Sequence, residues 1–153
     1  MIISSENCKV EFFDQPEYVT NRLGEIKNIL NLFVDFFDIL KLDLEISFCS
    51  ENLIRELNKK FRGKDSATNV LSFPSQLKSN NKLFLGDIIF SIETILEEAK
   101  RDNKTVENHL IHLFVHAVLH LLGYEHETEE QAKKMENLEI KILSNLQIDN
   151  PYS

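Results

Sequence analysis

The sequence predicts an α+β fold: a small mixed four-stranded sheet covered by about five helices, one of them a central buried helix that carries histidines. Three observations lead to this prediction. Short stretches alternate apolar and polar residues, other stretches have apolar residues at helical spacing, and residues 106–122 are apolar on nearly every side. The order of these stretches is β-α-β-α-β-β-α-α-α, which a single mixed sheet with helical cover accommodates.

Four segments have the pattern of β-strands, at residues 8–13, 42–48, 70–73 and 84–90. The first two alternate apolar and polar residues, which is typical of strands with one buried face. Between the last two strands, the polar run from Gln76 to Lys82 predicts a turn.

The first predicted helix begins at Pro16 and Glu17, because proline is well suited to the first helical position. Ser50 and Ser91 are predicted to cap the next two helices, since a serine hydroxyl can accept a hydrogen bond from a free backbone amide. The apolar stripe of the first helix comprises Val19, Leu23, Ile26, Leu30, Phe33 and Phe37.

Two further helices are predicted in the last third of the chain. One spans 106–122 and ends at Gly123, a residue favoured just beyond a helix. The other begins at Thr128, with Gln131 three residues later in a capping-box pattern. Its inward-facing residues are predicted to be Met135, Leu138, Ile142 and Leu146.

The 153 residues, 42% of them hydrophobic, predict one domain over 1–153. A net charge of −8 argues against a generally basic nucleic-acid-binding surface, but it leaves room for a local basic cleft. No segment approaches the ~18 apolar residues of a membrane span, and no signal-peptide pattern is present. Cys8 and Cys49 suggest no disulfide framework, so we expect a cytoplasmic protein without a membrane partner.

All five histidines lie between His109 and His126. Residues 109, 112, 116 and 120 fall on one narrow stripe of the predicted helix, whose other residues are almost all apolar. A helix that is apolar nearly all round is buried. Buried polar groups need partners, and several aligned imidazoles can share a metal ion.

The spacing of His116, His120 and His126 is that of a metal site. The first two lie one helical turn apart, Gly123 ends the helix, and His126 can fold back as a third ligand. This H-x-x-x-H-x-x-G-x-x-H pattern is the ligand spacing of metzincin proteases. Three protein ligands leave one position open, which is typical of a catalytic site for Zn²⁺. Such an ion lowers the pKa of water toward about 7.

For His109 and His112 the alternative to metal binding is a core histidine with a satisfied hydrogen-bond partner. His112 could instead contact substrate or a group that hydrogen-bonds a metal ligand.

A proteolytic base is missing from this pattern. Metzincins place a glutamate directly after the first histidine, where this chain has Ala117. Glu125 is either a hydrogen-bond partner of a ligand or a solvated surface residue. The sequence therefore predicts the metal ligands of such a site but lacks the glutamate that acts as general base in these proteases.

Three blocks of sequence resemble the YbeY family. HAVLHLLGYEH, at 116–126, is similar to the family signature H-G-x-L-H-L-x-G-Y-D-H. NKKFRGKDSATNVLSFP, at 58–74, resembles N-x-x-x-R-x-x-x-x-x-T-D-V-L-S-F-P, and LGDI, at 85–88, resembles a third block. The blocks keep the family's order and spacing. This chain departs from the pattern at Ala67, Asn69, Ala117 and Glu125, which removes no ligand but takes one carboxylate from the cleft region, at Asn69.

The resemblance implies a metal-dependent, single-strand-directed endoribonuclease that acts in ribosomal RNA maturation, notably at the 3′ end of the small-subunit RNA, and in ribosome quality control. It implies single-stranded or ribosomal RNA and the small ribosomal subunit as partners. The three histidines are then ligands of one divalent ion, and Arg62 and His116 are the predicted catalytic residues.

Arg62 also suits this chemistry on physical grounds, because a guanidinium can hold a phosphodiester through two parallel hydrogen bonds. The alternative is a surface arginine paired with Asp65 or another acid. Asp87 could orient a ligand histidine or cap a turn. A cleft lined by Arg62, Lys59, Lys60 and Lys64 could offset the net negative charge.

Two other functions remain open at this point. One is a metalloprotease or another metallohydrolase, against which Ala117 argues. The other is a non-enzymatic ribosome assembly factor with a structural metal, whose site would be closed by a fourth ligand such as His112.

Overall fold

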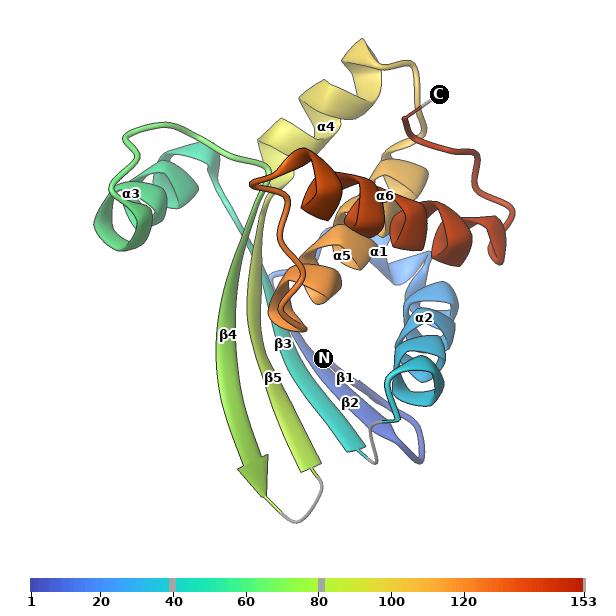
Figure 1. The fold of residues 1–153 in the computed structure, drawn as a ribbon. Coiled ribbons are helices and arrows are strands. Elements are labelled where there is room, and N and C mark those ends of the chain that lie inside the picture. Colours follow the sequence, from blue (N-terminus) through green and yellow to red (C-terminus); the bar gives the residue numbers. More distant parts are fainter. Residues whose placement is uncertain (39–40, 80–81, 153) are drawn as a thin grey trace.

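The structure is a computed structural model that describes residues 1–38, 41–79 and 82–152. Within these ranges one five-stranded sheet is covered by six helices (Figure 1). The α+β prediction is confirmed, with one strand and one helix more than the four strands and five helices predicted. The strands are β1 (Ile2–Ser4), β2 (Cys8–Phe13), β3 (Lys41–Cys49), β4 (Val70–Ser79) and β5 (Lys82–Ser91). The helices are α1 (Glu17–Thr20), α2 (Leu23–Phe36), α3 (Glu51–Arg62), α4 (Ile92–Arg101), α5 (Val106–Leu121) and α6 (Glu129–Ser144).

The strand order in the sheet is β1-β2-β3-β5-β4. The three inner strands β2, β3 and β5 are parallel, whereas β1 and β4 run antiparallel at the edges. Strand β1 escaped prediction because it has only three residues, too few to display a periodicity. It is held by its pairing with β2.

Strands β4 and β5 extend well into the segment predicted as a turn. Strand β4 reaches Ser79 and β5 begins at Lys82, so the predicted turn is wrong from Gln76 to Ser79 and at Lys82; residues 80–81 lie outside the described residues. Pro74 is tolerated because β4 is an edge strand. Opposite it, Gly86 has a φ of +139°, and a Cβ there would overlap the Phe73 carbonyl.

The first predicted helix is divided into α1 and α2. The backbone amides of Asn21 and Arg22 bond back to the carbonyls of Glu17 and Val19, which closes α1 after Thr20. Arg22 then lies outside the helical region, with a φ of −122°. The apolar stripe nevertheless continues, and α2 buries Ile26, Ile29, Leu30, Phe33 and Val34.

Helix α5 lies at the centre of the molecule and contacts β4, β5, α1, α4 and α6. Helices α1, α2, α5 and α6 lie on one side of the sheet (Figure 1). Ten of the sixteen residues of α5 are buried, as its apolar sequence predicts. The N-caps Ser50 and Ser91 and the capping box of Thr128 and Gln131 are confirmed. Among the described residues, no helix is long and apolar enough to cross a membrane.

Candidate metal centre

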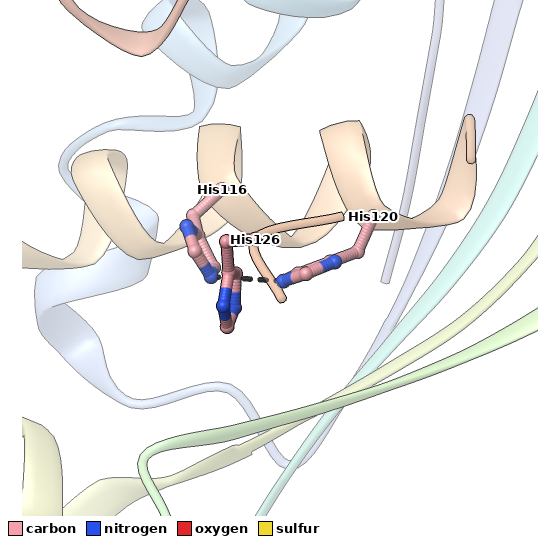
Figure 2. A group of neighbouring side chains, drawn as sticks. All are labelled: His116, His120 and His126. Carbon is pink, nitrogen blue, oxygen red and sulfur yellow. Dashed lines mark hydrogen bonds between the residues drawn. The ribbon is translucent and has the colours of Figure 1, made fainter. Parts of the chain in front are cut away.

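His116, His120 and His126 come together where α5 ends. The first two extend from the last two turns of α5, and the third comes from the loop that follows Gly123 (Figure 2). One ring nitrogen from each lies within 4.8 Å of the others. The ring centroids of His116 and His126 are 5.4 Å apart, and those of His120 and His126 are 4.8 Å apart. We call these three residues the histidine triad.

The Nδ1 atoms of the two helical histidines are occupied by acceptors. His120 Nδ1 donates to the Tyr124 carbonyl at 2.9 Å, which is possible because Gly123 turns the chain back over the helix end. His116 Nδ1 donates to the Glu139 carboxylate. Each bond places the ring proton on Nδ1 and leaves Nε2 with a free lone pair.

The carboxylate behind His116 belongs to Glu139 of α6, and its side chain is 0% exposed. It also accepts from His112 Nε2 at 3.3 Å and from the Tyr152 hydroxyl. Burial favours the neutral acid, but the hydrogen bonds from His112, His116 and Tyr152 outweigh it and lower the pKa of Glu139 to about 2. Glu139 is therefore ionised and can only accept hydrogen bonds.

His112 and Tyr152 complete this hydrogen-bonded group around the buried carboxylate, which we call the Glu139 cluster: His112, Glu139 and Tyr152. The His112 Nε2 atom lies 3.3 Å from the Tyr152 hydroxyl. Burial, followed by the neighbouring Glu139 carboxylate, raises the pKa of Tyr152, so the phenol stays protonated and donates. His112 thus points toward Glu139 and lies outside the triad.

The triad fits a divalent cation. His116 Nε2 and His120 Nε2 are 3.0 Å apart, and both carry lone pairs when their protons sit on Nδ1. Two acceptors at this distance repel unless a proton or a cation lies between them. Burial, and then the charge of a protonated His116, lower the pKa of His120 to about 4, so a proton is disfavoured there at neutral pH. Three imidazole nitrogens are a ligand set that suits zinc.

A cleft of about 770 Å³ opens in front of the triad. Its walls are the end of α3, the loop that leads to β4, the first half of β4 and the loop after α5. The Ser72 hydroxyl of β4 lies 3.5 Å from the Ala117 carbonyl, which ties this wall to α5. The triad therefore faces solvent on one side and the Glu139 cluster on the other.

Arg62 lines this cleft at the last residue of α3. One guanidinium nitrogen donates to the Ser72 carbonyl at 2.7 Å, which fixes the side chain against β4. Asp65 pairs with Arg55 at 2.8 Å, so the alternative pairing of Arg62 with Asp65 is wrong. Lys64 also lines the cleft. Lys59 and Lys60 do not, contrary to the expectation from sequence; they lie exposed on α3.

The remaining candidates are placed differently. Glu125 is exposed and lines the cleft. Asp87 pairs in register with Glu45, on the sheet face opposite the buried Ile46 and Ile88, and it raises the pKa of Glu45 through a hydrogen bond. It therefore neither orients a triad histidine nor caps a turn.

His109 bonds Glu98 at 3.0 Å, as expected of a core histidine with a satisfied partner. The Asn69 side chain donates to the same carboxylate at 3.0 Å. The hydrogen bond from His109 lowers the pKa of Glu98. Burial raises this pKa, but the hydrogen bond from Asn69 lowers it further, and the net shift is downward. Asn69 thus ties the cleft wall to α4 and α5, where a carboxylate would face Glu98 with like charge.

Sequence reasoning missed Glu139 and Tyr152. Glu139 had a usable signal, because it lies four residues after Met135 and three before Ile142 on the inward stripe of α6. A lone acid within an apolar stripe, facing a helix of histidines, predicts an ion pair or a hydrogen-bonded partner. Tyr152 lies in an irregular segment, where no periodicity indicates its direction.

Comparison with known proteins assigns the chain to a family. The family described as "Endoribonuclease YbeY" matches residues 10–147. An Endoribonuclease YbeY of Acinetobacter baumannii is 43% identical over 92% of each chain, and one of Francisella tularensis subsp. holarctica is 34% identical over 98% of this chain and 92% of the relative. A Thermotoga maritima protein solved in solution has a similar fold, with a TM-score of 0.60 and 26% identity over 90% of this chain and 91% of the other. The chain belongs to the YbeY endoribonuclease family.

Proposed function

We propose that residues 1–153 form a single metal-dependent hydrolase domain that cleaves single-stranded RNA in ribosomal RNA maturation and ribosome quality control, in the cytoplasm. The observation that carries the proposal is the open side of the histidine triad, which shares one cleft with Arg62. The relatives named above are endoribonucleases by name, which supports RNA as the substrate. The 3′ end of the small-subunit RNA, and with it the small ribosomal subunit, is the target we propose within this class.

The triad would hold the ion through His116, His120 and His126. A bound Zn²⁺ supplies Lewis acidity: it offsets negative charge on a phosphoryl oxygen and lowers the pKa of water toward about 7. Glu139 and the Tyr124 carbonyl hold the first two rings with Nε2 directed at the cleft. These bonds fix tautomer and orientation before any substrate arrives.

Arg62 would bind the scissile phosphodiester. Its bond to the Ser72 carbonyl uses one of the five guanidinium N–H groups and leaves the others for phosphate oxygens. Among the described residues that line the cleft, carboxylates come only from Glu125 and Glu127. Position 117, where a protease glutamate would stand, is a fully buried alanine, so peptide hydrolysis is not supported.

The direct test incubates zinc-loaded protein with single-stranded RNA that contains a small-subunit 3′ end. We expect endonucleolytic products from the unmodified protein and neither products nor bound zinc from His120→Ala. His109→Gln is the control on the same helix, because His109 lies about 10 Å before His116 and hydrogen-bonds Glu98 instead of joining the triad. Cleavage by His120→Ala at the unmodified rate, or no cleavage by zinc-loaded protein, would refute the proposal.

A further inference from the structure

The cleft has walls of opposite charge. Arg62 and Lys64 line it on the side of α3, whereas Glu125 and Glu127 line it on the side of the loop after α5. A phosphodiester chain is attracted to the first wall and repelled by the second. An RNA strand in the cleft would therefore be drawn toward the wall that carries Arg62 and Lys64.

The basic wall continues beyond the cleft onto the exposed end of α3, which extends past the β4 edge of the sheet (Figure 1). Lys59 and Lys60 precede Arg62 there. Within the described part of the chain, none of the cations at 59, 60, 62 and 64 forms a salt bridge. The nearby Asp65 is held by Arg55, although Lys59 adds slightly to the lowering of its pKa. Four cations within six residues contrast with a net charge of −8 for the whole chain.

An aromatic ring stands among these cations. Phe61 is 57% exposed, so its ring is accessible to a ligand. Its ring meets Phe73 of β4 edge to face, with centroids 5.5 Å apart, and Lys60 Nζ lies 5.2 Å from its centroid. Phe73 follows Ser72, whose carbonyl holds Arg62, so the ring is positioned at the same strand edge as the guanidinium. Exposed aromatic rings among cations are what single-stranded nucleic acids bind by stacking.

We propose that Phe61, Lys59 and Lys60 form a second RNA contact outside the cleft, which we call the α3 platform. One base stacks on Phe61, and the adjoining phosphates contact the two lysines. This subsite rests on the proposed RNA-cleaving function and adds a substrate path to it. The competing explanation is that cations gather at the end of α3 because they stabilise the negative end of a helix dipole. Helix α4 also has cations, Lys100 and Arg101, in its last turn, and it therefore provides the comparison.

The experiment compares two platform variants with two matched controls. Lys59→Ala/Lys60→Ala is matched by Lys100→Ala/Arg101→Ala, which removes the same charge from the last turn of another helix. Phe61→Leu keeps an apolar contact with Phe73 and is matched by Phe36→Leu, since Phe36 is 59% exposed on α2. Binding of single-stranded RNAs of about 4 and about 16 nucleotides is measured by fluorescence anisotropy in EDTA, and cleavage is measured with zinc. Thermal unfolding confirms that each variant is folded.

We expect Phe61→Leu to weaken binding of the longer RNA by about fivefold or more. The loss of affinity for the longer RNA should be at least about fivefold greater than the loss of affinity for the shorter RNA. The lysine variant should reduce the slope of log affinity against log salt by about 1.4, or about 0.7 per lysine. Equal losses in the matched controls, equal losses for both RNA lengths, or no loss would overturn the platform. Absence of cleavage by the unmodified protein would refute the proposed nuclease activity. The anisotropy measurements would still test whether the α3 platform binds RNA.

Discussion

Behind the histidine triad, Glu139 is 0% exposed and accepts from His112, His116 and Tyr152, whereas in front of it Arg62 and Lys64 line an open cleft. The rear is a hydrogen-bonded network centred on one buried carboxylate, so loss of Glu139 leaves the donors around it without their acceptor. The front is solvated, and its cations are free to exchange water for phosphate. This contrast indicates a division of tasks: the rear sets the protonation and direction of the ligands, and the front binds the substrate. Substitutions on the two sides should therefore change different measured quantities.

Among the substitutions that separate the front from the rear, the largest effect is expected from Arg62→Ala at the front. Loss of the guanidinium should lower the RNA cleavage rate by about 10²–10³-fold, the range found when one preorganised donor to a transition state is removed. Zinc affinity should not change, because Arg62 contacts no triad residue. Arg55→Ala, on an exposed face of the same helix, is the control. A parallel loss of zinc affinity in Arg62→Ala would erase the distinction between front and rear.

At the rear, Glu139→Gln should weaken zinc binding by about 10–100-fold, because the amide accepts more weakly than a carboxylate and no longer fixes His116. Competition with a chelating dye measures this affinity. The free energy of unfolding should also fall, by about 1–3 kcal/mol, since buried donors lose an ionised acceptor. Unchanged zinc affinity together with slower cleavage would mean that Glu139 acts on the substrate instead.

Tyr152→Phe should have a smaller effect of the same kind. The hydroxyl donates to Glu139, but the residue is 45% exposed, so water can replace part of the lost bond. We expect a several-fold loss of zinc affinity and a decrease of about 1 kcal/mol in the free energy of unfolding. Tyr18→Phe is the control with the opposite sign: burial raises the pKa of Tyr18 to about 12, and its hydroxyl has no hydrogen-bond partner among the residues that the structure describes. Removal of that hydroxyl should leave stability unchanged or increase it.

The smallest effect concerns Glu98, which joins the cleft wall to α5 through Asn69 and His109. Its pKa is lowered in the folded protein, so its ionised form contributes stability above the unfolded value of about 4.3. This contribution is lost as the pH falls through the folded pKa. Urea unfolding of metal-free protein between pH 6.5 and 3.5 should show a difference between unmodified protein and Glu98→Gln that shrinks below about pH 4.3. A difference independent of pH would contradict this role.

Sequence alone predicted the parts of the site that lie on a regular helix. The spacing of His116 and His120, and Gly123 after them, determines that the two rings share a face and that the chain can turn back. The apolar residues on nearly every side of α5 predicted its central, buried position. Arg62 was indicated mainly by the resemblance to the YbeY family. Nothing in the sequence of α3 shows that its last residue reaches the Ser72 carbonyl of β4.

What sequence could not predict depends on contacts between distant elements. Tyr152 meets Glu139 from an irregular segment, and the pairing of Asp87 with Glu45 depends on the strand order β3-β5, which the alternation of apolar residues does not determine. The expected lysine-lined cleft failed at Lys59 and Lys60 for the same reason. Residue spacing predicts which side chains share a face of a helix, but it does not predict which element of the fold lies against that face.

The close approach of Gly86 to the Phe73 carbonyl has a consequence for mutational tolerance. Any side chain at position 86 would push β4 away from β5. Strand β4 carries both the Ser72 carbonyl that anchors Arg62 and the Ser72 hydroxyl that contacts α5. A single added methyl group at this position would therefore misalign the Arg62 guanidinium and the histidines together, so we expect Gly86→Ala to lower cleavage activity as well as stability.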